Sequence, residues 1–303
     1  MRDRFISFVL HFGKRRSKGQ KNRFISALFD MMNPLGYELK AHQFKHAGKI
    51  GKNIIAGDLN NAKIVYMVDY DTKERVFNNA FRYYPFDEAF NMKVLRSNLL
   101  KYFICSCGAM GLMILSFLRA NQAEGHFVYF YYAGAAFAAI VSFIFARGVA
   151  SPYNFKKTAS IFALCEIAKN NNQCCYVFLD QSLFVGIGKY RFFQEYDLKG
   201  KIIIYLDNAA IGSLKVAKVS KNAPRSLITY LQKNEEIDDV LVEQLETAEN
   251  NEFVYIYVTL CEKDEEGNHY IDHISTKTDS EFVEDDFGKA INVIQEIQTK
   301  ILK

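Results

Sequence analysis

Two long apolar segments in the middle of the chain limit what it can fold into. They cover residues 99–118 and 127–145, and Lys101 is the only charged residue inside them. Crossing the hydrocarbon core of a bilayer takes ~20 apolar residues at a rise of ~1.5 Å each, so both segments are long enough to span it as helices. The alternative interpretation is a pair of buried core helices in a soluble protein.

The charges around these segments predict how they cross the membrane. The connection between them, residues 119–126, is short, so the two helices are expected to be antiparallel neighbours, and Arg119 is its only Lys or Arg. Basic residues stay preferentially on the cytoplasmic side. We therefore expect an integral protein of the cell membrane with both termini and the rest of the chain in the cytoplasm. The flanking basic residues are Lys93, Arg96, Lys101, Arg147, Lys156 and Lys157.

Outside the apolar segments, the sequence alternates between strand and helix patterns. The clearest strand is KIVYMVDYDT, residues 63–72, a buried apolar run that ends in Asp69 and Asp71. Such alternation favours an α/β fold with a parallel or mixed three-layer sheet. Further strands are predicted at residues 53–56, 175–180, 201–207, 213–219 and 253–260, and helices at residues 22–32, 158–169, 188–196 and 285–302.

One more helix is predicted after residue 233. Asn234 is a suitable N-cap, and an acidic segment with an apolar stripe follows it. The stripe consists of Ile237, Val240, Leu241 and Leu245.

The N-terminal segment, residues 1–21, is basic. Its apolar run at residues 5–12 predicts a short amphipathic or interfacial helix. A basic cluster beside a membrane segment fits anionic lipid better than nucleic acid, and a solvated face is the alternative. The net charge of +4 is too small to indicate nucleic-acid binding. The expected division is therefore residues 1–21, a domain made of residues 22–95 and 148–303, and a transmembrane hairpin at residues 96–147.

The six cysteines show no metal-binding spacing. None forms a Cys-x-x-Cys pair, and Cys105 and Cys107 lie inside the first apolar segment. This pattern fits structural thiols in a reducing compartment.

Five short segments, in chain order, resemble the motifs of the two-zinc aminopeptidase-like family, metallopeptidase family twenty-eight. The order of the five segments along the chain carries the resemblance. It covers residues 22–72 and 151–303, and it implies a three-layer α/β sheet of the zinc-aminopeptidase (phosphorylase/hydrolase-like) type, interrupted by the two-helix transmembrane hairpin. The segments are residues 53–72, 158–168, 177–188, 205–207 and 274–279.

The resemblance also implies a site of two zinc ions, and here the sequence departs from the family. Asp69 replaces the first histidine, Lys156 falls on the bridging aspartate, and Ser275 replaces the last histidine. Ser182 and Leu183 fall on the Glu-Glu pair, which supplies the general base. Only Asp207 and the orienting Asp71 match. The degenerate positions are Asp69, Asp71, Lys156, Ser182, Leu183, Asp207 and Ser275.

Lys156 is the most damaging of these changes. An ammonium ~3 Å from a divalent ion, at an effective dielectric of ~20, is repelled by roughly 10 kcal/mol. Hydroxyl groups also replace zinc ligands poorly. A cation held by relocated ligands remains an alternative, with Asp69, Asp71, Asp207 and His273 as its residues. The competing interpretation is that these acids make hydrogen bonds and that His273 is a surface residue.

The sequence therefore predicts a membrane-anchored, zinc-peptidase-like protein that has no cofactor and no catalysis. We expect it to bind a peptide or a membrane-protein partner in the former active-site cleft, with the lipid bilayer as its other partner and a homo-oligomer as an open question. The alternatives are an active metallo-aminopeptidase that uses zinc on relocated ligands, and an assembly subunit that pairs through its membrane helices.

Overall fold

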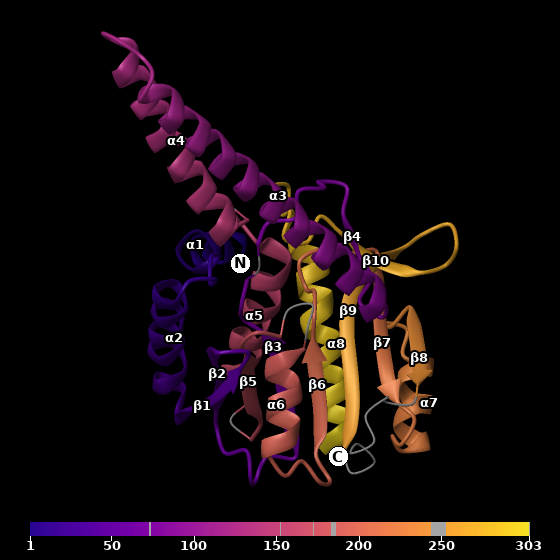
Figure 1. The fold of residues 1–303 in the computed structure, drawn as a ribbon. Helices are drawn as coiled ribbons and strands as arrows, with labels where there is room; N and C mark the ends of the chain where they lie inside the picture. Colours follow the sequence, from indigo (N-terminus) through magenta and orange to yellow (C-terminus); the bar gives the residue numbers. More distant parts are fainter. Residues whose placement is uncertain (73, 152, 172, 183–185, 244–252, 303) are drawn as a thin grey trace.

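Within the described residues of the computed structural model, ten strands form one mixed sheet with helices on both faces (Figure 1). The structure describes residues 1–303 except 73, 152, 172, 183–185, 244–252 and 303. The strand order is β1-β2-β5-β3-β6-β9-β10-β4, and β7 pairs with both β9 and β8. The strands are β1 (Leu39–His46), β2 (Lys49–Ala56), β3 (Ile64–Asp69), β4 (Arg82–Tyr83), β5 (Cys175–Leu179), β6 (Ile202–Leu206), β7 (Leu214–Ser220), β8 (Asp239–Glu243), β9 (Val254–Lys263) and β10 (His269–Asp272).

The helices cover the sheet unequally. Five of them contribute to the larger hydrophobic core on one face, while α6 covers the other face. The helices are α1 (Arg2–Phe12), α2 (Lys18–Met32), α3 (Glu88–Ala120), α4 (Phe127–Arg147), α5 (Phe155–Ala168), α6 (Ile187–Glu195), α7 (Arg225–Lys233) and α8 (Glu284–Leu302), with a 3-10 turn η1 (Asn33–Leu35) after α2.

The central strands alternate between the two cores. In β3, Tyr66 and Val68 belong to the core shared with α5 and α8, whereas Val65 and Met67 belong to the core under α6. Successive side chains of a strand point to opposite faces, so a strand buried on both faces must be apolar throughout. This explains the continuous apolar run, and it confirms the predicted three-layer α/β architecture.

The N-terminal helix α1 is part of this core. Phe5 is fully buried, and Phe8 and Val9 are buried beside it. The Phe5 ring packs on the rings of Phe162 in α5 and Phe287 in α8. The apolar side of the predicted amphipathic helix therefore contacts protein, and among its large apolar residues Leu10 stays 71% exposed.

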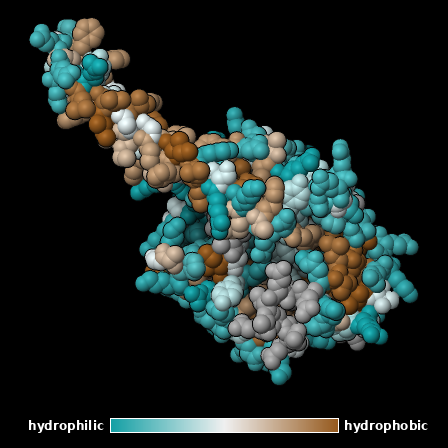
Figure 2. All heavy atoms as spheres, turned by 45° about the vertical axis from the view of Figure 1, so that its right-hand side comes forward, coloured by the Kyte–Doolittle hydropathy of each residue, from teal (hydrophilic) through white to brown (hydrophobic). Residues whose placement is uncertain are grey.

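Helices α3 and α4 form an antiparallel hairpin that projects from the domain (Figure 1). Both are long and apolar enough to cross a membrane, and only 11% of the apolar stretch in each is buried. Figure 2 shows hydrophobic residues along the shaft of this hairpin and hydrophilic ones at its tip. Core helices of a soluble protein would be mostly covered, so this exposure argues against that alternative.

The prediction of a helix after Asn234 is wrong. Residues 239–243 form strand β8, which pairs in parallel with β7. Asn234 instead ends α7, and its side chain accepts a hydrogen bond from the backbone N–H of Glu236. Short apolar runs do not distinguish helix from strand, and here pairing with a neighbouring strand decides the conformation. Leu245, the last member of the predicted stripe, lies outside the described residues.

Candidate functional site

The carboxyl edge of the sheet brings together the acids that end the central strands. Asp69 is the last residue of β3, Asp71 lies two residues beyond it, and Asp207 follows β6. Strands β3 and β6 are parallel neighbours, so their carboxyl ends meet at one edge. The three side chains are at most 3% exposed. Buried carboxylates require partners, because an isolated ionised carboxylate is strongly destabilised away from water.

Lys157 supplies the partner of Asp207. It lies in the first turn of α5, and its ammonium contacts Oδ1 of Asp207 as an ion pair. Tyr257 donates a hydrogen bond to Oδ2 of the same carboxylate. Burial lowers the pKa of Lys157 to about 8, against the opposing attraction of Asp69 and Asp71. The cation at the centre of this site is thus a lysine side chain.

Asp69 and Asp71 complete the inner part of the site. Tyr205 donates a hydrogen bond of 2.6 Å to Oδ2 of Asp69, and Oδ1 has no hydrogen-bond partner among the described residues. Burial raises the pKa of Asp69, although the nearby Lys157 ammonium opposes this shift. Asp71 accepts a hydrogen bond of 3.1 Å from the backbone N–H of Ser182.

Lys156 points toward another group of residues. Its ammonium lies 3.5 Å from Oε2 of Glu281. Its backbone N–H donates to Oδ1 of Asp279 at 3.2 Å, and the backbone N–H of Ser275 donates to Oδ2 at 3.0 Å. Burial raises the pKa of Asp279, and the Lys156 ammonium opposes this shift. Asp279 therefore fastens the start of α5 to the loop that carries Ser275.

Two further cations come from the N-terminal segment. The guanidinium of Arg15 is fully buried and donates to the backbone oxygen of Tyr70 at 2.5 Å and to Oγ1 of Thr158 at 3.1 Å. Burial lowers the pKa of Arg15 to about 9, opposed by Asp71. Lys21 in α2 forms an ion pair with Asp180, the residue after β5. Side-chain cations from two parts of the chain thus neutralise the acids at this edge.

A layer of tyrosines closes the site. Tyr83 of β4, Tyr205 of β6 and Tyr257 of β9 are all buried. The Lys157 ammonium lies 5.3 Å from the centre of the Tyr83 ring, and the rings of Tyr205 and Tyr257 are 5.0 Å apart. The segment that carries Tyr83 leads directly into α3. The start of the hairpin therefore helps to cover the acids.

Lys157 and this tyrosine layer were not anticipated from the sequence. Lys157 follows Lys156 directly, and the orientation of the first turn of α5 determines which of the two side chains faces Asp207. The tyrosines left a clearer signal. Tyr205 stands two residues before Asp207, and Tyr255 and Tyr257 alternate on the neighbouring strand, so all three point to one face of the sheet.

Three of the predicted residues remain to be placed. Ser182 is beside Asp71, since its backbone N–H donates to the Asp71 carboxylate, whereas Leu183 is outside the described residues. The Nδ1 atom of His273 lies 2.5 Å from the backbone oxygen of Asn79, away from Asp69 and Asp207. Among the residues that the structure describes, no three His, Cys, Asp or Glu side chains are grouped so that they would hold a metal ion.

The loops around the site are unusual in their backbone. Asn154, Gln181, His273 and Ser275 have positive φ values of 53° to 61°. Residues other than glycine rarely adopt this conformation, which costs of order 1–3 kcal/mol and is found preferentially at functional sites. Each of these loops also carries or adjoins a residue predicted for the site.

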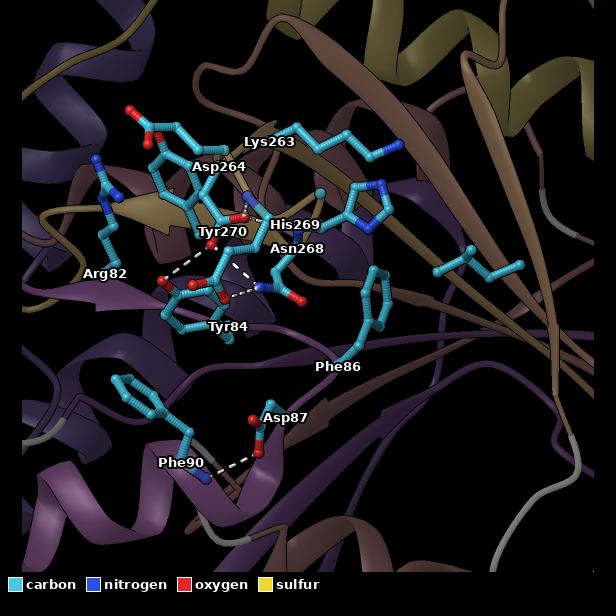
Figure 3. Close-up of a pocket in the computed structure, with 14 residues that line it drawn as sticks. Arg82, Tyr84, Phe86, Asp87, Phe90, Lys263, Asp264, Asn268, His269 and Tyr270 are labelled. Atoms are coloured by element: carbon cyan, nitrogen blue, oxygen red, sulfur yellow. Dashed lines mark hydrogen bonds between the residues drawn. The ribbon is translucent and has the colours of Figure 1, made fainter.

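An open cavity lies next to the closed centre. It has a volume of about 990 Å³ and is bordered by the start of α3 and by the β9–β10 hairpin. Phe86 lines it and packs on Tyr257, with ring centres 5.4 Å apart. In Figure 3, Tyr84 and Asp264 point toward each other across a hydrogen bond of 3.4 Å. Two aromatic residues, Phe86 and Tyr257, therefore connect the cavity wall to the buried Asp207.

Comparison with solved structures identifies the fold as that of glutaminyl cyclases and bacterial aminopeptidases. The chain is similar to the glutaminyl cyclase of Porphyromonas gingivalis, with a TM-score of 0.58, 13% identity and coverage of 98% of this chain and 96% of that one. It is also similar to the glutaminyl cyclase of Bacteroides thetaiotaomicron bound to N-acetylhistamine, with a TM-score of 0.53, 12% identity and coverage of 97% and 94%.

A leucine aminopeptidase precursor of Bacteroides thetaiotaomicron gives a TM-score of 0.51 at 12% identity, with coverage of 97% of this chain and 92% of that one. No protein-family model and no curated protein sequence matches the chain. These likenesses confirm the predicted zinc-aminopeptidase-like fold. At such low identity they establish the fold alone.

Proposed function

We propose that this chain is a membrane-anchored, catalytically inactive relative of the zinc peptidases that binds a peptide or protein partner. One observation carries the proposal: the Lys157 ammonium is ion-paired with Asp207, the acid that the family resemblance assigns to metal binding. A zinc ion bound there would lie next to a buried ammonium group.

The donor set does not fit a pair of zinc ions. Zinc takes imidazole, thiolate and carboxylate ligands. Here Asp207 is ion-paired, Asp71 accepts from Ser182, and the serines at positions 182 and 275 offer hydroxyl groups. Lys156, on the predicted bridging position, points to Glu281. Oδ1 of Asp69 and Oδ1 of Asp207 have no hydrogen-bond partner among the described residues, and Oδ1 of Asp207 is the atom that contacts the Lys157 ammonium. These residues would have to rearrange before they could bind a metal ion.

Binding would then use the space that the tyrosine layer leaves open. The closed centre admits no peptide, whereas the adjacent cavity combines aromatic faces with polar groups, which is typical of ligand sites. This moves the expected contact from the former metal site to the cavity beside it, on the other side of Phe86 and Tyr257.

The membrane anchor gives this cavity an orientation. Both connections to the hairpin leave the carboxyl edge of the sheet: β3 leads toward α3, and α4 leads into α5, which carries Lys157. Asp87, the N-cap of α3, and Phe90, in its first turn, also line the cavity. If α3 and α4 span the bilayer, the cavity opens near the cytoplasmic membrane surface. A partner that is itself anchored in the membrane would reach it readily.

Two measurements test this function. A photoreactive amino acid at Phe90, which is 40% exposed in the cavity, should crosslink to a defined peptide or protein in native membranes, whereas the same group at Val242, also 40% exposed but outside the cavity lining, should not. The purified protein should not hydrolyse aminoacyl amides with zinc present. Zinc-dependent hydrolysis that Asp207→Asn abolishes would overturn the proposal in favour of an active metallo-aminopeptidase.

A further inference from the structure

Hydrogen bonds join the base of the α3–α4 hairpin to the domain. The side chain of Asn98 in α3 accepts a hydrogen bond from the backbone N–H of Phe77 at 3.0 Å and donates to the backbone oxygen of Arg75 at 3.1 Å. The Tyr102 hydroxyl also donates to the oxygen of Arg75 at 2.9 Å. The backbone N–H of Arg75 in turn donates to the oxygen of Val149, after α4, at 2.7 Å. The domain is therefore held against both helices.

The N-terminal segment is fastened to the same place. The Arg16 guanidinium donates to the backbone oxygen of Gly148, the residue after α4, at 2.7 Å, and forms an ion pair with Glu74 at 3.1 Å. Residues 74 and 150 form an isolated β-bridge. Three stretches that are far apart in the sequence, residues 13–18, 74–77 and 147–150, thus meet where the hairpin leaves the domain.

Exposed basic side chains surround this junction. No acidic residue occurs in residues 13–18, 91–101 or 143–157. The acid that does lie at the junction, Glu74, is paired with Arg16. The exposed cations of these stretches are Lys14, Lys18, Lys93, Arg96, Lys101 and Arg147.

Helix geometry places part of this set at the depth of lipid headgroups. If the span begins at residue 99, Arg96 lies ~4.5 Å and Lys93 ~9 Å outside the hydrocarbon core along α3. The headgroup layer is roughly 5–8 Å thick on each side. Lys101 lies inside the span near its end, from where its long side chain reaches the interface. On α4, the Arg147 guanidinium stacks on the Phe143 ring at 4.1 Å and stays exposed.

We propose that this junction and the adjoining part of α3, residues 91–101, form a binding surface for the headgroups of anionic phospholipids, with Lys14, Lys93, Arg96 and Arg147 as its basic residues. The inference rests on the proposed membrane insertion and concerns the orientation of the α/β domain at the membrane surface. The junction is hydrogen-bonded to α3 and to the residues that follow α4. Lipid bound there therefore sets the orientation of the domain, and of the cavity beside α3, relative to the bilayer surface. A basic residue near an anionic surface contributes about 1 kcal/mol, which is roughly fivefold in affinity.

The test uses the full chain in lipid nanodiscs. Spin-labelled phosphatidylglycerol and phosphatidylcholine are compared as probes of the lipid that contacts the protein. We expect the wild type to prefer the anionic probe at least fivefold, and the preference to fall in high salt because exposed charges are screened. The quadruple variant Lys14→Gln, Lys93→Gln, Arg96→Gln and Arg147→Gln should lose most of it.

A matched control changes four exposed lysines outside the junction stretches: Lys40→Gln, Lys45→Gln, Lys199→Gln and Lys233→Gln. It alters the net charge equally and should keep the preference. A wild type without preference, or equal losses in both variants, would overturn the inference. Extraction of the wild type from membranes by alkaline carbonate is a separate result, which would instead refute the membrane anchor.

Discussion

Lys157 and Asp207 form an ion pair at the carboxyl edge of the sheet, and both side chains are almost completely buried, at 2% and 0% exposure. Taking two charges out of water is costly, and their mutual attraction offsets that cost only when the geometry and the surrounding hydrogen bonds are good. Here Tyr257 supplies a further hydrogen bond to the carboxylate. The pair explains how this chain, with the fold of glutaminyl cyclases and aminopeptidases, can keep the charge of Asp207 buried at the edge of the sheet.

Lys157→Met should destabilise the folded domain by about 3–5 kcal/mol at neutral pH, because it leaves Asp207 buried with neither a cation nor an N–H donor from position 157, whereas a deprotonated lysine would keep the donor. Urea unfolding in detergent, followed by the near-ultraviolet circular dichroism of the tyrosines, measures this change. The exposed Lys199→Met serves as the control and should change stability by less than about 0.5 kcal/mol. The double variant Lys157→Met/Asp207→Asn should recover a large part of the loss, since it removes both charges. Equal losses in the single and double variants would contradict this account.

Lys157 should also make stability depend on pH in alkaline solution. Its pKa is lowered from 10.5 in the unfolded chain to about 8 in the folded one. Between these values the unfolded state binds more protons, so stability rises with pH, by at most about 1.4 kcal/mol per unit for one group. Unfolding free energies from pH 7.5 to 10.5 should therefore rise relative to those of the Lys157→Met/Asp207→Asn variant. If the difference in unfolding free energy between wild type and this variant is constant or falls over this pH range, the lowered pKa of Lys157 is refuted.

Asp69→Asn should stabilise the protein at neutral pH. Burial raises the pKa of Asp69, so the folded state binds its proton more tightly than the unfolded state does. The stability from this group is therefore complete below its unfolded pKa of 3.8 and is lost as pH rises through the higher folded value. The advantage of Asp69→Asn should disappear in acid. The exposed Asp197→Asn is the control, and a variant less stable than wild type at pH 7 would show that the Asp69 charge is needed.

The proposed topology, with the domain in the cytoplasm, predicts which positions are accessible from outside the cell. If the hairpin crosses the membrane, its tip emerges outside, and a cysteine replacing Glu124, in the connection between α3 and α4, should react with a membrane-impermeant maleimide in intact cells. A cysteine replacing the exposed Lys277 in the domain should react only after permeabilisation. The reverse pattern would place the domain outside the cytoplasm, and labelling of neither cysteine in intact cells would indicate that the hairpin does not cross.

Much of the fold could be predicted from the sequence because the hydrophobic patterns of the central strands and of the helices are local. The runs at residues 63–72 and 201–207 are apolar throughout, as a strand buried on both faces requires, and they became β3 and β6. Strand β1 was missed because it is an edge strand in which only His42 and Phe44 are buried, so its pattern is mostly polar. Strand β8 was taken for a helix because its conformation depends on pairing with β7.

The site was less predictable, because it depends on where side chains point. Motif order brought Asp69, Asp71 and Asp207 to one edge, since parallel strands end together. Sequence spacing could not show that Lys157, and not Lys156, contacts Asp207. Nor could it show that Arg15, from the N-terminal segment, is buried against Tyr70. Contacts between residues so far apart in the chain are set by packing of the whole domain.

The metal content of the detergent-purified wild type, measured by mass spectrometry after dialysis against zinc, tests the central claim most directly. If the Lys157 ammonium is the resident cation of this site, the protein should hold well below one zinc ion per chain. About two tightly bound zinc ions per chain would contradict the account. That result would mean that Lys157 moves away from Asp207 in solution and that the protein should be studied as a working peptidase.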